Sequence, residues 1–336
     1  MGVLIIGCED HRFDEHGHNE NHHHDSHSHQ HSADERVPLP VSRSKLVFPL
    51  PEVVNSNQPL ARLGWKLFND PNLSSNGQIS CNSCHDLASN GADLIPLSVG
   101  VGGLGERNSP TVFNVSLNTR FFWDGRSNTL EAQVDGPIHN PLEMDNSWPE
   151  IESYLRQHPD YPTLFAQAGV EDIGEHGVKQ ALSYFQSQLI TPPSRFDQFL
   201  AGQDDALTAV ELAGWEQFNS RGCILCHQGP NVGGSIYQKF GYYIDTEATL
   251  DVGREAITGE EIDHSVFRVP SLRNVTITAP YFHDGKVMEL KSAIYIMAKV
   301  QLGQELNEQS IAEIAAFLQS LETPRPTILG QLENEN

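Results

Sequence analysis

The sequence predicts a mainly α-helical fold with little β-structure, divided into two related domains. Apolar residues recur at helical spacing in several segments, strong strand patterns are scarce, and a set of short motifs occurs twice along the chain. The 336 residues are enough for one large domain or two ordinary ones. Glycine and proline punctuate long loops between the helical segments.

Helices are expected where apolar side chains recur three and four residues apart. The segments with this spacing are 60–68, 151–168, 177–189, 207–218 and 309–321. Thr208 is the expected N-cap of the fourth segment, because a threonine hydroxyl can accept a hydrogen bond from a free amide of the first helical turn.

Three pairs of motifs indicate an internal duplication. The paired segments are "GWKLFN" (64–69) with "GWEQFN" (214–219), "RNSPTVFNV" (107–115) with "RVPSLRNV" (268–275), and "FFWDGRSNTLEA" (121–132) with "YFHDGKVMELKSA" (281–293). We therefore expect two domains, at 37–205 and 206–325, joined near an acidic stretch at 200–211. Residues 326–336 are expected to form a flexible C-terminus.

Composition narrows the possible partners. The formal net charge is −23 at pH 7, and nucleic acid phosphates would be repelled by it, whereas a basic protein partner would not. Apart from the first residues, which are too few to span a bilayer, no segment reads as a transmembrane helix.

The first 36 residues have two distinct parts. "MGVLIIGC" resembles the end of a bacterial lipoprotein signal, with Cys8 as the residue to be lipidated, and the alternative is an ordinary N-terminus with a stray cysteine. Residues 9–36 contain nine of the sixteen histidines and almost nothing apolar, so we expect them to be disordered. Such a tract can bind Cu²⁺, Zn²⁺ or Ni²⁺, or can be a solvated linker with no selected metal.

Four of the five cysteines form two identical patterns, "CNSCH" at 81–85 and "CILCH" at 223–227. Cys-x-x-Cys-His is the attachment signature of c-type haem: both thiols bond to the haem, and the histidine becomes the proximal iron ligand. A zinc ribbon would pool the four cysteines on one ion, but more than a hundred residues separate the two pairs. The sequence therefore predicts two cytochrome c-like haem domains with long haem-facing loops, in an exported protein whose expected location is the bacterial periplasm.

The two halves differ at one position that bears on iron ligation. Met297 follows Leu290 by seven residues, whereas the residue seven after Leu130 is Pro137, which cannot bind iron. A methionine opposite a histidine gives a fully ligated, electron-transferring iron with a raised potential. The alternative is that Met297 is a gap-filling residue of a helix core, and spacing alone does not decide between them.

At this point a family resemblance is clear. Between about residues 60 and 321, the segments "LFNDPNLSSNGQISCNSCHDLASNGAD", "FFWDGR", "GCILCHQGPNVGG" and "LRNVTITAPYFHDGKVMELKSAIYIM" resemble the bacterial di-haem cytochrome c peroxidases, relatives of the MauG-type enzymes. The resemblance implies that peroxide reacts at the first haem. It also implies that the second haem accepts electrons from a small donor and has Met297 as its second ligand.

The same resemblance implies roles for further residues. Trp123 matches a tryptophan between the haems that is suited to electron transfer, and its alternative role is an aromatic core residue. Gln133 and Glu143 match polar residues of the peroxide pocket, with Glu143 the expected acid–base group. Asn108, Thr278 and Pro280 match the protein ligands of one Ca²⁺ ion, which favours oxygen ligands.

The loop 97–108 differs from many members of that family. Where those relatives have a histidine that covers the peroxidatic iron in the oxidised protein, this chain has Val101, which cannot ligate iron. We therefore expect an open first iron and activity without prior reduction, unless Met144 or His139 reaches the iron instead. The expected reaction is reduction of H₂O₂ to water with electrons from a small redox protein (a cytochrome c or a cupredoxin), in a homodimer.

Two other functions stay open on the sequence. A MauG-like enzyme would oxidise tryptophan or tyrosine of a partner protein, which the Val101 loop favours and Met297 disfavours. A non-enzymatic electron carrier would have two fully ligated irons.

Overall fold

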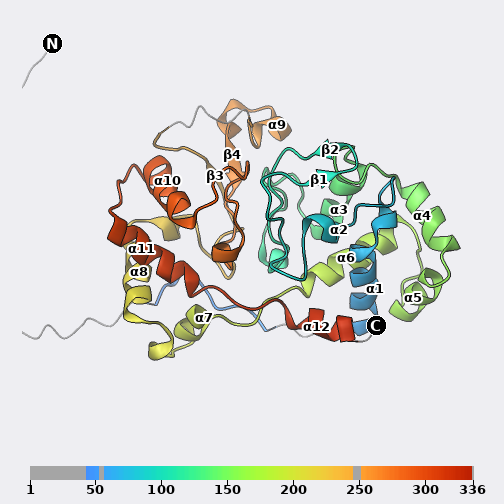
Figure 1. Cartoon of the computed structure of the whole chain (residues 1–336), viewed down its shortest axis with the longest axis horizontal. Coiled ribbons are helices and arrows are strands. Elements are labelled where there is room, and N and C mark those ends of the chain that lie inside the picture. Colours follow the sequence, from blue (N-terminus) through green and yellow to red (C-terminus); the bar gives the residue numbers. More distant parts are fainter. Residues whose placement is uncertain (1–42, 53–56, 245–250, 335–336) are drawn as a thin grey trace, which may run out of the picture. The chain divides into compact units, whose positions relative to one another are not determined.

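The computed structural model describes residues 43–52, 57–244 and 251–334, and it is mostly helical, as the sequence predicts (Figure 1). The helices of the first half are α1 (Gln58–Asn69), α2 (Cys81–Cys84), α3 (Leu130–His139), α4 (Trp148–Gln157), α5 (Tyr161–Ala168) and α6 (Glu175–Ser187). Those that follow are α7 (Arg195–Leu200), α8 (Ala209–Ser220), α9 (Glu255–Thr258), α10 (Leu290–Leu302), α11 (Glu308–Gln319) and α12 (Thr327–Asn334). Among the described residues, the β-strands form two short antiparallel pairs, and the remaining β-structure is isolated bridges.

The first pair joins β1 (Val99–Gly100) to β2 (Gly103–Leu104) through a two-residue turn. The second joins β3 (Tyr237–Lys239) to β4 (Val266–Arg268), with Tyr237 opposite Arg268. These pairs are too short to form a core of their own, so the described fold depends on helix packing and on the loops between helices.

The repeated glycine of the two "GW" motifs lets two helix pairs pack in the same way. A Cβ atom on Gly64 would lie 2.1 Å from the carbonyl oxygen of Ala181, so α1 and α6 are in backbone contact there. A Cβ atom on Gly214 would lie 1.9 Å from the carbonyl oxygen of Glu313, so α8 and α11 are in equivalent contact. Any larger residue would force either pair apart.

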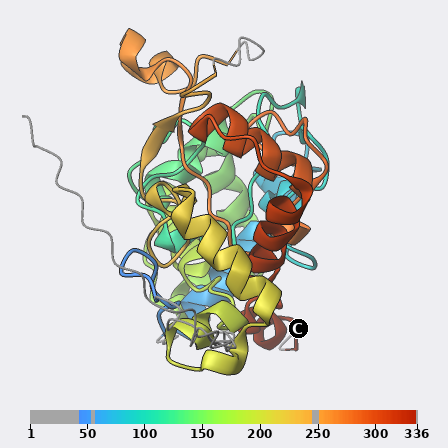
Figure 2. The same ribbon diagram turned by 90° about the vertical axis from the view of Figure 1, so that its left-hand side faces the viewer.

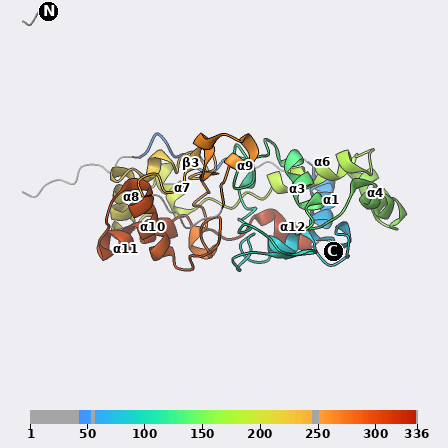
Figure 3. The same ribbon diagram turned by 90° about the horizontal axis from the view of Figure 1, so that it is seen from above.

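Two hydrophobic clusters form around these helix pairs. The first includes Leu63 and Leu67 of α1 and Phe185 of α6. The second is rich in aromatic residues, with Trp215 and Phe317 at a ring distance of 5.2 Å. Figures 1 and 3 show α8, α10 and α11 gathered in one group and α1, α3 and α6 in another, and Figure 2 views the α8 group end-on, with α8 in yellow.

The predicted helix start at Thr208 is confirmed. Its hydroxyl accepts a hydrogen bond from the amide of Glu211, and the Glu211 side chain accepts one from the Thr208 amide in return. This reciprocal pair satisfies amide groups that the first turn of α8 leaves without a helical partner.

The structure corrects two expectations. Residues 151–168 are not one helix: α4 ends at Gln157, because His158 precedes Pro159 and has an extended backbone, and α5 begins at Tyr161. Residues 327–334 are not a flexible tail but form α12, whose Ile328, Leu329 and Leu332 are buried in the first cluster. These three residues lie on one face of the helix, and burying them stabilises a segment that its length and charge made look disordered.

The domain boundary between residues 205 and 206 stays a prediction. The second cluster already includes Phe196 and Phe199 of α7, and also Val47, which comes from the start of the described chain. Cys8 and the histidine-rich tract lie outside the described residues. Within the described part of the chain, no helix has the length and apolar character needed to cross a membrane.

Candidate functional site

The first cysteine motif forms a single helical turn. Ser80 and Ser83 cap α2 reciprocally, and the amide of His85 donates to the carbonyl of Cys81 over 3.0 Å. The Nδ1 atom of His85 lies 2.9 Å from the carbonyl oxygen of Pro110. This contact fixes the ring and leaves Nε2 as the nitrogen available to iron. Burial lowers the pKa of His85, which favours the neutral ring that ligation requires.

The second cysteine motif has the same turn. The amide of His227 donates to the carbonyl of Cys223 over 3.0 Å. Burial lowers the pKa of His227 to about 4. Its Nδ1 is buried without a hydrogen-bond partner among the described residues, and the carbonyl of Pro270, equivalent to Pro110 in the repeat, is near but outside hydrogen-bonding geometry.

The residues at both turns fit covalently attached haem. All four cysteines are free thiols, and burial raises the pKa of Cys81 to about 12 and of Cys223 to about 11. Within the described residues, His, Cys, Asp and Glu side chains form no cluster able to hold a metal ion by themselves.

The ligand-free loop lies against the segment that carries Glu143. Val101 is in the turn between β1 and β2, and its amide donates to the carbonyl of Glu143 over 2.8 Å. A Cβ atom on Gly100 would lie 2.0 Å from the carbonyl oxygen of Leu142, and one on Gly102 would lie 2.4 Å from that of Pro141. Glycine is therefore required at these two positions, because any side chain there would collide with the backbone of the segment that carries the candidate acid–base residue.

Glu143 is half-buried and oriented by a neighbour. The side-chain amide of Asn140 donates to Oε1 of Glu143 over 2.7 Å. Burial raises the pKa of Glu143, while the hydrogen bond from Asn140 and the charge of Arg126 act in the opposite direction. The charge of Glu143 contributes to the raised pKa values of Cys81 and Cys84, so the carboxylate is within electrostatic reach of the first haem-attachment turn.

Other candidates near this site are placed differently. Gln133 is a half-buried residue of α3, the helix that ends just before Asn140. Met144 is buried in the first hydrophobic cluster, and Nδ1 of the exposed His139 lies 3.0 Å from the carbonyl oxygen of Asn146. A role of Met144 or His139 as a replacement iron ligand stays a prediction.

Trp123 lies between the two halves of the repeat. Its indole Nε1 donates to the carbonyl of Asn108 over 2.8 Å, and its ring meets that of His283 edge-on at 6.3 Å. The duplication aligns His283 with Trp123, so these are equivalent residues facing each other. Sequence reasoning missed His283, although the repeat itself contained the signal.

The contacts around Trp123 are reciprocal. The amide of Arg268 donates to the carbonyl of Trp123 over 2.7 Å, and the amide of Asn108 donates to the carbonyl of His283 over 2.8 Å. Arg268 and Asn108 are equivalent in the repeat, so each half supplies one donor and one acceptor to the other. Arg107 adds an ion pair with both oxygens of Asp251.

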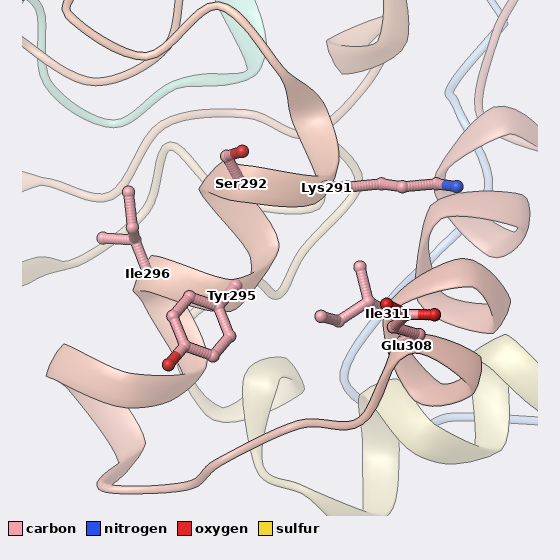
Figure 4. Close-up of a pocket in the computed structure, with 6 residues that line it drawn as sticks. All are labelled: Lys291, Ser292, Tyr295, Ile296, Glu308 and Ile311. Carbon is pink, nitrogen blue, oxygen red and sulfur yellow. The ribbon is translucent and has the colours of Figure 1, made fainter.

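Met297 is half-buried on α10. Beside it, Ile296 lines a hollow of about 580 Å³ between α10 and α11 (Figure 4). The other lining residues are Lys291, Ser292, Tyr295, Glu308 and Ile311. None of them is a haem-attachment residue, so this hollow is separate from the chemistry discussed above.

The candidate calcium residues come from both halves. The side-chain amide of the buried Asn108 donates to the carbonyls of Ile95 and Pro96, which leaves its oxygen as an acceptor. The hydroxyl of Thr278 donates to the carbonyl of Val275, and Pro280 follows a cis peptide bond. Since Asn108 bonds to the backbone at His283, the Asn108 and Pro280 segments meet at the same junction.

Comparison with known proteins identifies the family. A model of the di-haem cytochrome c peroxidases matches residues 58–205. The cytochrome c551 peroxidase of Nitrosomonas europaea is 42% identical over 83% of this chain and 84% of its own length. This chain belongs to the di-haem cytochrome c peroxidase family. The cytochrome c551 peroxidase of Pseudomonas aeruginosa, another member, is also 42% identical, over 85% of this chain and 86% of its own length.

Solved structures agree with this membership and with the fold class. A MauG-like protein associated with microbial copper homeostasis superposes with a TM-score of 0.72 and 28% identity, covering 83% of this chain and 94% of that one. Membership of a di-haem family accounts for the presence of two Cys-x-x-Cys-His turns in this chain.

Proposed function

We propose that this protein is a cytochrome c peroxidase that reduces hydrogen peroxide to two molecules of water with two electrons and two protons. The electrons come from a small redox protein, a cytochrome c or a cupredoxin. The observation that carries the proposal is the pairing of the Val101 loop with Glu143 in a chain about 42% identical to two peroxidases. The loop has no iron ligand, and the glutamate beside it can move protons.

Two haems would supply the redox chemistry, and the chain's residues divide into two sets around them. Cys81, Cys84 and His85 would hold the first haem, where peroxide reacts. Cys223, Cys226 and His227 would hold the second, with Met297 as the opposite ligand of its iron. A fully ligated second iron suits electron transfer, and an open first iron suits a reacting ligand.

Glu143 would act as the acid–base group that accepts and returns a proton. Its pKa is raised by burial, so it is a better proton acceptor at working pH than an exposed glutamate, and it can return the same proton. It would take a proton from the peroxide oxygen nearer the iron and deliver it to the oxygen that leaves as water. Asn140 positions Glu143, and Gln133 would orient the peroxide by hydrogen bonding.

Val101 would make the enzyme active without prior reduction. Because the loop offers no histidine to cover the first iron, the oxidised protein would be ready to bind peroxide. Trp123, buried between the halves and fixed by its bond to Asn108, would carry electrons from the second haem to the first.

Steady-state turnover tests this function. The oxidised protein is mixed with H₂O₂ and a reduced cytochrome c or small copper protein, and oxidation of the donor is followed. We expect immediate turnover with no lag. Turnover only after pre-reduction would contradict the role of Val101, and no turnover with any such donor would contradict the peroxidase assignment.

A MauG-like activity is the second candidate, favoured by the superposition on a MauG-like protein and by the histidine-free loop. Such an enzyme would oxidise tryptophan or tyrosine of a partner protein and would turn over poorly with the small donors. A di-haem electron carrier would show no peroxide consumption at all. Measuring peroxide consumption together with donor oxidation therefore separates all three functions.

The remaining assignments are finer parts of the same proposal. Asn108, Thr278 and Pro280 would bind one Ca²⁺ through oxygen atoms. The protein would work in the periplasm as a homodimer, anchored by a lipid on Cys8 if the first residues are a lipoprotein signal. The histidine-rich tract would capture a transition metal.

A further inference from the structure

Arg268 is a buried cation with an unused donor. It ends β4, and only 5% of its surface is exposed. Its Nε donates to the carbonyl of Phe122 over 3.2 Å, but one of its terminal nitrogens is buried without a hydrogen-bond partner among the described residues. Burial lowers the pKa of Arg268 to about 10.

Two other arginines of the described chain, Arg273 and Arg107, have carboxylate partners. Arg273 is 2% exposed and donates to both oxygens of Asp197 at 2.8 Å. Arg107 is paired with Asp251 and Asp124. Arg268 forms no ion pair with any described residue. An isolated charge in a low-dielectric interior is strongly unfavourable, so a buried guanidinium requires an anion close by.

The position of Arg268 indicates where that anion comes from. Arg268 precedes Pro270 by two residues, and the backbone of Pro270 is close enough to the His227 ring to affect its pKa. On its other side, Arg268 bonds to the backbone of Phe122 and Trp123. The backbone segment that carries Arg268 therefore lies between the second haem-attachment site and the tryptophan proposed to conduct electrons from it.

Haem itself provides the missing anion. Each haem has two propionate carboxylates on one edge, and the planar fork of a guanidinium matches a carboxylate with two parallel hydrogen bonds. At the equivalent position of the first half stands Asn108, which is neutral. The cation is thus specific to the second site.

We propose that Arg268 binds a propionate of the haem held by Cys223, Cys226 and His227, and thereby keeps the reduction potential of that haem high. Arg268 is a positioning residue: it touches the haem edge and not the reacting atoms. The proposal rests on the haem attachment described above, but not on peroxide turnover.

Replacing Arg268 has two expected effects. The variant Arg268→Gln removes a positive charge that favours the reduced iron, so the midpoint potential of the second haem falls. The freed propionate then regains an ordinary carboxylic pKa. As pH falls through that pKa, protonation removes its negative charge and the potential rises again. The wild-type potential is flatter over the same pH range, because the guanidinium keeps the propionate ionised.

The experiment is an equilibrium redox titration of the full-length holoprotein, followed by absorbance between about pH 5 and 8, without peroxide. Arg254→Gln is the matched control, because Arg254 also contacts Tyr237 but has a carboxylate partner in Asp263. We expect a lowered, pH-dependent midpoint for the second haem in Arg268→Gln and a smaller, pH-independent change in the control. Unchanged potentials, a shift confined to the first haem, or an equal shift in Arg254→Gln would overturn the proposal.

A second variant covers failure of Arg268→Gln to fold or to load haem. Arg268→Lys keeps the charge but replaces the two-pronged contact with a single ammonium group. Resonance Raman spectra of this holoprotein should show a shifted propionate-bending band. An unshifted band would contradict the contact. Both readouts are independent of catalysis, so a protein that proves inactive with peroxide can still pass or fail them.

Discussion

At the scale of single residues, the site depends on one carboxylate and the side chain that orients it. Asn140 fixes Oε1 of Glu143 at 2.7 Å, and burial raises the pKa of that carboxyl. The backbone of Glu143 also receives the amide of Val101. A single residue therefore links the proposed proton chemistry to the loop that is proposed to leave the first iron open.

The variant Glu143→Gln tests this residue. Glutamine preserves the shape but cannot accept and return a proton, so turnover with H₂O₂ should fall by about two to four orders of magnitude. Glu150→Gln, in an exposed position on α4, is the control and should leave turnover unchanged. Near-wild-type rates in Glu143→Gln would remove this residue from catalysis.

The pH dependence provides a second readout of Glu143. Because its pKa is raised, the carboxylate form that accepts a proton is lost at a higher pH than for an exposed glutamate. The acidic limb of kcat/KM should accordingly lie above the usual range of glutamate, and this limb should be missing from Glu143→Gln.

At the residue scale, the sequence allowed predictions only from covalent signatures and from matches to the family. The haem-attachment residues follow from a pentapeptide, because that chemistry requires neighbouring atoms along the chain. Asn140 and Arg268 were missed, because their roles depend on partners such as Glu143 and Phe122 that only the fold brings near. The assigned roles of Gln133, Trp123 and Met297 stay predictions.

At the scale of elements, the β1–β2 hairpin is the feature that distinguishes this site from the relatives that have a histidine in the equivalent loop. It is held against the residues after α3 by backbone contact, with Gly100 and Gly102 at the closest points. The small residues of this hairpin leave room for the segment that carries Glu143, and under the proposed function the hairpin also offers no ligand to the first iron.

Gly100→Ala should displace the hairpin. Its new Cβ would lie 2.0 Å from a backbone oxygen, an overlap that costs about 1–3 kcal/mol of unfolding free energy. Turnover should fall with it. Gly105→Ala is the matched control in the same loop, because its Cβ would meet nothing closer than 3.6 Å. Denaturant unfolding compares the two, and equal stability would contradict the tight contact.

Elements with a strong apolar period were predicted well from sequence, and the others were not. α1, α6, α8 and α11 follow the expected segments closely, since burying a continuous apolar stripe decides their structure. α12 was missed because its few apolar residues gain their burial from the first cluster, far away in sequence. The break between α4 and α5 depends on local backbone preferences that periodicity does not reveal.

At the scale of the whole molecule, the duplication explains how the two halves contact each other. Equivalent residues exchange backbone hydrogen bonds around Trp123 and His283. Arg107 then joins Asp251 of the second half to Asp124 of the first, so a charged network crosses the same junction. The sequence predicted two related halves, but not that the residues joining them would be repeat partners.

Asp251→Asn should weaken this junction. Losing a partly buried, charge-assisted pair costs about 1.5–3 kcal/mol of unfolding free energy at neutral pH. The guanidinium of Arg107 lowers the pKa of Asp251, so the pair stabilises the fold at neutral pH and this contribution is lost as pH falls through that lowered pKa. Unfolding curves of wild type and variant should therefore converge in acid. Asp204→Asn, at an exposed pair with Arg43, should change little at any pH.

The central claim is that one iron has an open coordination position while the other is ligated on both sides. Electron paramagnetic resonance and absorption spectra of the fully oxidised holoprotein measure both irons together. We predict one high-spin centre at the His85 site and one low-spin centre with histidine and methionine ligands at the His227 site. Two low-spin centres, each with side chains on both faces, would contradict the account.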